Sequence, residues 1–188
     1  QFAGMSSARL SVDLGDMGTI AFDQGSGSGL GTIDDKTPTA AEEIWDGLDA
    51  AAASASDKNG LVGTAGASGV FNYVQTIEGV TFNGAWRKGA GAKNSDGGVS
   101  GDGTSQGAWD FALTASGDAL GAPGLTAGLG YGVDTMASSD NKHNTIFANY
   151  SVGPVTVGVQ LSDIDNGGTT TDTETEALGI AFNVNDNL

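Results

Sequence analysis

The sequence predicts an all-β protein, an antiparallel transmembrane β-barrel with an inward-folded acidic loop that carries a short helix. Three observations lead to this fold class. Apolar and polar residues alternate along short segments, short and long connections follow each other in turn, and no run reaches the ~18 apolar residues of a membrane helix. We expect residues 1–188 to form part of a single barrel domain, with a constriction-type loop at 24–66.

The composition is compatible with a barrel that has a wet interior. Apolar residues make up 38% of the 188-residue chain, glycine is abundant at 32 residues, and proline is scarce at 3. This apolar content is low for a globular core but natural for a barrel whose inner face contacts water. Strands that meet lipid must close into a barrel, because an open edge leaves unpaired backbone groups in hydrocarbon.

The charge balance narrows the range of partners. The formal net charge is −16, from 23 acidic and 7 basic residues. Nucleic acid is therefore excluded as a partner, because phosphate binding needs a basic patch. Cationic partners fit this balance better. The chain has no cysteine, which excludes disulfides and thiolate metal sites.

Nine segments show the period of two that is typical of strands with one apolar face. We take the apolar side of each strand as the outward side. The expected strands are 8–14, 19–23, 67–77, 80–88, 107–116, 125–133, 143–152, 155–162 and 175–184.

Two of these strands carry mixed signals. The third leaves two registers open, in which the outward pair is either Phe71 and Tyr73 or Val70 and Val74. In the seventh, Phe147 interrupts an otherwise regular alternation.

The connections between the expected strands favour a membrane barrel. They alternate between tight turns and longer loops, as in barrels that have periplasmic turns and extracellular loops. Trp86 and Trp109 lie near outward strand ends, where an aromatic girdle would contact the membrane interface. A sandwich also contains alternating strands, so a soluble or secreted acidic all-β surface or adhesive protein is the alternative. Such a protein would bury its apolar stripes on a partner sheet.

The long connection at 24–66 carries the signals of a capped amphipathic helix. Thr39 and Glu42 match a capping box, and the alanine-rich run after them favours a helix over about 40–55. One stripe of this helix is acidic and consists of Glu42, Asp46 and Asp49. The opposite stripe is apolar and is expected to pack on the inner barrel wall. The acidic stripe then faces the water-filled lumen.

Three sequence motifs resemble the general porins of Gram-negative outer membranes, most closely the proteobacterial type. They are ARLSVDL followed by GDMGTIAF at 8–22, GLGTIDD at 29–35 leading into EEIW at 42–45, and YSVGPVTVG at 150–158. The resemblance implies a sixteen-stranded, trimeric channel in the outer membrane. It also implies passive diffusion of small hydrophilic solutes and ions, with no reaction catalysed. Nine strands and an early third loop lead us to expect an internal fragment of the barrel.

The resemblance also implies a pore constriction in which acids on the loop face arginines on the wall. Between Asp34 and Asp49 there are six acids and one base, Lys36. In a narrow passage such a cluster concentrates cations and repels anions. The expected constriction residues are Asp34, Asp35, Glu42, Glu43, Asp46, Asp49, Arg9 and Arg87. The alternatives are a solvated acidic helix face, and an Arg9 that lines the lumen without affecting selectivity.

Other motifs give weaker signals. His143 is the only histidine, so triads that need histidine and histidine-rich zinc sites are excluded. The glycine-rich stretch at 25–31 lacks the end of a phosphate loop and is interpreted as a flexible hinge. Asp163 and Asp165 resemble half of a calcium loop, and weak Ca²⁺ binding by loop acids is left open. No other cofactor or metal is expected.

Overall fold

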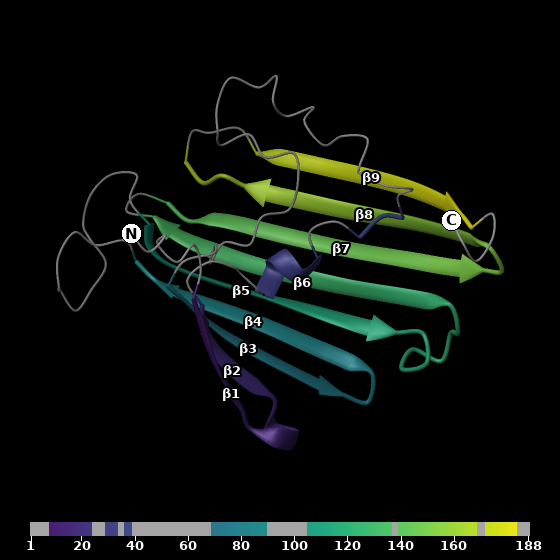
Figure 1. Cartoon of the computed structure of the whole chain (residues 1–188). Helices are drawn as coiled ribbons and strands as arrows, with labels where there is room; N and C mark the ends of the chain where they lie inside the picture. The colour runs from purple at the N-terminus through teal and green to yellow at the C-terminus, as the bar shows by residue number, and fades with distance from the viewer. Residues whose placement is uncertain are drawn as a thin grey trace, which may run out of the picture.

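In the part of the chain that the structure describes, nine antiparallel strands form one sheet in which each strand pairs with its neighbours in the sequence. The computed structural model describes residues 8–23, 29–33, 36–38, 69–89, 105–136, 139–168 and 172–183. Figure 1 shows the strands crossing one twisted sheet in chain order, from β1 in purple to β9 in yellow. The strands are β1 Arg9–Asp13, β2 Thr19–Asp23, β3 Val70–Ile77, β4 Val80–Lys88, β5 Ser105–Ser116, β6 Leu125–Met136, β7 Asn141–Val152, β8 Val155–Asp165 and β9 Thr173–Phe182. The all-β antiparallel fold class is therefore confirmed.

The pairing register separates two faces of the sheet. We call the inner face the side that carries the row Ala21, Asn72, Ala85, Asp110 and Gly132, one residue from each of β2 to β6. The outer face carries the adjacent row Phe22, Phe71, Trp86, Trp109 and Val133. Because side chains alternate along a strand, these two rows fix the side of every other strand residue.

The outer face is apolar and largely exposed. Its exposed side chains include Leu129, Ile146, Val157, Leu161 and Ile180. Such a continuous apolar surface needs a covering medium, because soluble monomers rarely expose large contiguous apolar patches. Among the described residues, no helix has the length and apolar character needed to cross a bilayer.

Two of the connections at one end of the sheet are two-residue turns, whereas the connection between β5 and β6 at the same end spans 117–124. Glu78 and Gly79 both have positive φ, 49° and 82°, between the paired residues Ile77 and Val80. This is the backbone that a two-residue hairpin requires, and its twist matches that of the strands. Gly153 likewise has a φ of 56° before Pro154. The tight turns predicted at these positions are confirmed.

The structure resolves the ambiguity in the third strand. Phe71 lies on the outer face, with 49% of its surface exposed, whereas Val70 and Asn72 are buried on the inner face. Phe71 also contacts rings on both neighbouring strands, at centroid distances of 5.0 Å from Phe22 and 5.9 Å from Trp86. The register with Phe71 and Tyr73 outward is the observed one.

Several predicted strand ends are wrong at the end of the sheet that carries the long connections. β6 continues to Met136 and β8 to Asp165, beyond the predicted 133 and 162. β9 begins at Thr173, and Asp163 pairs with Glu174 across the ladder. Backbone pairing does not need apolar side chains, so the ladder extends past the point where the apolar alternation stops.

The assignment of the two faces predicts opposite effects of an added charge. Leu129→Arg on the outer face should lower the free energy of unfolding by about 2–4 kcal/mol, because it puts a charge at the membrane midplane. Urea titration of protein refolded into lipid vesicles measures this value. The inner-face control Ser162→Arg should lie within about 1 kcal/mol of the parent. Equal destabilisation by both variants would contradict the assignment.

Candidate functional site: a chain segment held on the inner wall

A short stretch of the long connection packs on the inner face. Gly29–Ile33 forms the 3₁₀-helix η2, which contacts β4, β5 and β6. Figure 1 shows η2 in front of the sheet at β5 and β6. Leu30 and Ile33 have no exposed surface and form a buried cluster with Ala112 and Phe147. The inner wall thus has a local apolar core under η2.

Glycine at position 130 makes room for this cluster. Gly130 lies on the inner face of β6, between Ala112 on β5 and Thr145 on β7. A Cβ atom at this position would collide with Cδ1 of Leu30 and would come within 3.0 Å of Cδ1 of Ile33. Gly130 is therefore the base of the socket that receives both side chains.

A buried carboxylate holds the start of η2. The backbone N–H of Leu30 donates to Oδ1 of Asp110 at 2.8 Å, and Asp110 is only 2% exposed. Gly29 has a φ of +65°, and a Cβ atom there would overlap Oδ1 of Asp110. Glycine at 29 allows both this backbone conformation and this close approach. Asp110 therefore fixes η2 to β5.

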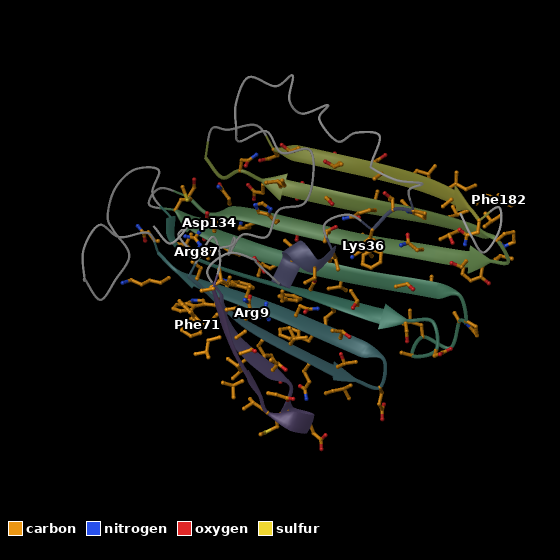
Figure 2. The ribbon with its side chains drawn as sticks, in the orientation of Figure 1. Arg9, Lys36, Phe71, Arg87, Asp134 and Phe182 are labelled. Carbon is orange, nitrogen blue, oxygen red and sulfur yellow. The ribbon has the colours of Figure 1, made fainter. Side chains whose placement is uncertain are left out.

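A side-chain amide on β8 holds the other end of the segment. Nε2 of Gln160 donates to the carbonyl oxygen of Ile33 at 3.0 Å, and its Oε1 accepts from the N–H of Lys36 at 2.9 Å. Nδ2 of Asn149 on β7 donates to the carbonyl oxygen of Lys36. Gln160 is 5% exposed, so its bonds are shielded from water. Figure 2 shows Lys36 over the middle strands of the sheet.

The segment then continues toward β9 over two glycines. Pro38 lies against Gly158 on β8 and Gly179 on β9, which pair with each other. A Cβ atom at Gly179 would come within 2.9 Å of Cδ of Pro38. We call residues 29–33 and 36–38 the wall segment. It crosses the inner face from β4 to β9, and each contact lies on the side opposite the apolar surface.

Comparison with known proteins shows the family of the chain. A family model described as Gram-negative porin matches residues 1–187. The chain belongs to the Gram-negative porin family. A search of curated proteins gave no match. Porins reside in the outer membrane as β-barrel channels, so the outer face contacts lipid and the inner face lines the lumen. This sets aside the alternative of a soluble or secreted surface protein.

The charged residues of the porin wall form a group near the long connections. Nη2 of Arg87 on β4 lies 3.8 Å from Oδ1 of Asp134 on β6, above the buried Ala108 of β5. Figure 2 shows Arg87 and Asp134 side by side. Arg9 lies on β1 and is exposed, and it too makes a contact with another group. Arg9 and Arg87 lie in the same row of the sheet as the buried Val70, so both belong to the inner face, as expected.

The acids predicted for the constriction all belong to one part of the chain. Asp34, Asp35, Glu42, Glu43, Asp46 and Asp49 lie outside the described residues, as does the helix expected at 40–55. Their approach to Arg9 and Arg87 stays a prediction. The hinge predicted at 25–31 is wrong for Gly29–Gly31, because these residues belong to η2 and Gly29 and Leu30 are buried.

Two of the weaker motifs have local structural roles. Oδ1 of Asp165 accepts from the N–H of Gly167 at 3.1 Å, and its other oxygen lies 3.7 Å from Nζ of Lys142. Asp163 accepts from the side chain of Asn144 at 3.3 Å. Within the described ranges, no group of three or more histidine, cysteine or acidic residues could hold a metal ion.

Sequence reasoning missed the residues that hold the wall segment. Asp110, Asn149 and Gln160 resemble other polar lumen residues when only the sequence is considered. Phe147 did carry a signal, because a large apolar side chain on a wet face needs a partner. The structure shows that Leu30 and Ile33 are its partners.

The contact between Asp110 and Leu30 predicts a protease phenotype. Asp110→Ala leaves the Leu30 N–H without its acceptor, which costs about 1–3 kcal/mol of local stability. Trypsin should then cleave after Lys36 at least about fivefold faster in the folded, detergent-solubilised porin. Asp110→Asn keeps an oxygen acceptor and should be cleaved more slowly than the alanine variant. Identical rates for the parent and Asp110→Ala would show that Asp110 does not hold the segment.

Proposed function

We propose that this porin forms a water-filled, cation-preferring channel for passive diffusion of small hydrophilic solutes, and that the connection at 24–66 narrows it. The observation that carries the proposal is the course of the wall segment. It leaves β2, crosses the inner face from β4 to β9, and is bonded to the wall by Asp110, Asn149 and Gln160. A connection bonded to the lumen wall reduces the open cross-section of the pore.

The charge of this connection supports cation preference. Six acids and one base lie between Asp34 and Asp49, next to the wall segment. Two unit charges ~4 Å apart interact by about 4 kcal/mol near a protein surface, compared with about 1 kcal/mol in bulk water. On the wall, Asp134 offsets the charge of Arg87. One of the two arginines expected to face the acids is therefore already paired with an acid of the wall.

The remaining expectations follow from the family. We propose a homotrimer in outer-membrane lipid, with small hydrophilic solutes and cations as the transported species. A porin of this kind catalyses no reaction and needs no cofactor for diffusion. Weak Ca²⁺ binding by the loop acids stays a prediction, which a calcium titration of the purified porin would test.

Neutralising the acidic stripe should change selectivity more than conductance. In the variant Glu42→Gln, Asp46→Asn and Asp49→Asn, we expect the K⁺/Cl⁻ permeability ratio to fall toward one. The effect should be largest at low salt, because the Debye length falls from about 10 Å at 0.1 M to about 3 Å at 1 M. Reversal potentials of the full-length porin in planar bilayers under a KCl gradient measure the ratio.

The outer face offers a matched control with the same change in net charge. Asp163, Glu174 and Glu176 point outward near the long connections, because they share outer-face rows with Tyr131 and Leu161. Neutralising these three acids should leave the reversal potential close to that of the parent. If this control lost as much selectivity as the variant of Glu42, Asp46 and Asp49, the cation preference would depend on overall charge. That result would contradict an acidic constriction.

A further inference from the structure

The outer face of β3 to β5 carries a cluster of aromatic rings around one glycine. Tyr73, Gly84 and Phe111 form one row across these strands. The ring of Phe82 lies 6.1 Å from that of Tyr73 and 6.1 Å from that of Phe111. Because Gly84 has no side chain, the Phe82 ring packs over it, and the neighbouring rings line an open hollow.

This hollow is a pocket of about 420 Å³. Its outer-face lining consists of Ile20, Phe71, Tyr73, Phe82, Trp86, Trp109 and Phe111, with Gly84 at its base. We call it the Gly84 pocket. Its volume lies within the range of small-molecule sites, about 300–1,000 Å³, and its lining is almost wholly apolar. A Cβ atom at position 84 would come within 2.8 Å of the Phe82 ring, so a larger residue there would reduce the pocket.

The pocket lies just below the expected membrane interface. Trp86 and Trp109 pair across β4 and β5 on the side of the long connections, and their side chains are 50% and 43% exposed. Tryptophan in barrels is enriched at the level of the lipid headgroups. Below these two residues, the pocket opens toward the hydrocarbon of the same leaflet.

One basic residue lies above the pocket on the same face. Lys88 follows Trp86 by two positions, so strand alternation puts it on the outer face, and it is exposed. Among the described residues, no acid forms a salt bridge with Lys88, whereas the other outward lysine, Lys142, lies 3.7 Å from Asp165. A lysine with no acidic partner among the described residues is unusual on a chain with 23 acids and 7 bases.

The spacing of these features matches the shape of a lipid. Gly84 and Lys88 are four residues apart on β4, which corresponds to about 13 Å along a strand. That is less than the ~15 Å half-thickness of the hydrocarbon core, so one molecule can reach both points. A lipid with a phosphate headgroup offers hydrocarbon to the aromatic rings and negative charge to the ammonium group.

We propose that the Gly84 pocket binds an acyl chain of an anionic lipid whose phosphate pairs with Lys88. This binding site needs only the membrane location of the porin and is independent of the constriction and its selectivity. A second copy of the chain would also cover aromatic residues, but it would not account for a lysine above the hollow that has no acidic partner among the described residues.

Tryptophan quenching by brominated lipids tests the site. In a background in which Trp45 and any tryptophan outside residues 1–188 are replaced by phenylalanine, the fluorescence comes from Trp86 and Trp109, and both line the pocket. The folded porin is reconstituted with either phosphatidylglycerol or phosphatidylcholine, each carrying the same dibrominated acyl chains. We expect half-maximal quenching at about a fivefold lower mole fraction of the anionic lipid, as expected for one lysine at the membrane surface.

Three variants separate the parts of the site. Lys88→Gln should remove the preference for phosphatidylglycerol, whereas the control Lys142→Gln should retain it. Gly84→Leu should weaken quenching by both lipids because it fills the hollow. If Gly84→Leu fails to fold, Gly84→Ala gives a graded version of the same test.

Other results would overturn the proposal. Equal quenching by the two lipids, or an unchanged preference in Lys88→Gln, would show that the site does not bind an anionic headgroup. Protection of both tryptophans from either lipid would show that a protein surface, such as a second copy of the chain, covers the pocket.

Discussion

The architecture of the pore depends on one requirement, that a chain leaving the sheet for the lumen wall must find partners for its backbone groups. Three polar side chains on the strands supply these partners for the wall segment. Asp110 accepts from the N–H of Leu30, Gln160 bonds to both Ile33 and Lys36, and Asn149 donates to Lys36. Buried backbone groups without partners are costly, so these bonds decide where the segment lies.

The two faces of the same strands serve two different media. Most outward positions carry apolar side chains that lipid can cover, and most inward positions carry small or polar ones, with Phe147 and Val70 as inward exceptions. The inner face is also where glycine matters, since Gly130, Gly158 and Gly179 let the wall segment approach the backbone of β6, β8 and β9. Because these glycines have no side chains, the wall has room for the segment at these three positions.

Charge is distributed unevenly over the sheet. Arg87 and Asp134 pair on the inner face near the long connections, while Lys142 and Asp165 pair on the outer face of neighbouring strands. Lys88 differs from these bases because no described acid balances it. Its position above an aromatic hollow is the basis of the proposed contact with an anionic lipid headgroup.

The nine strands, the outward faces of all but the third, and the tight turns at 78–79 and 153–154 could be predicted from the sequence. These depend on local rules, the period of two along a strand and the positive φ that glycine allows, so they can be recognised without knowing the fold. The way in which the long connection contacts the wall could not be predicted, because it depends on contacts between distant parts of the chain. Leu30 and Asp110 are 80 positions apart, and Lys36 and Gln160 are 124 apart, so no local pattern links them. Phe147 interrupted the alternation of its strand, but the reason becomes clear only from its contact with the apolar side chains of η2.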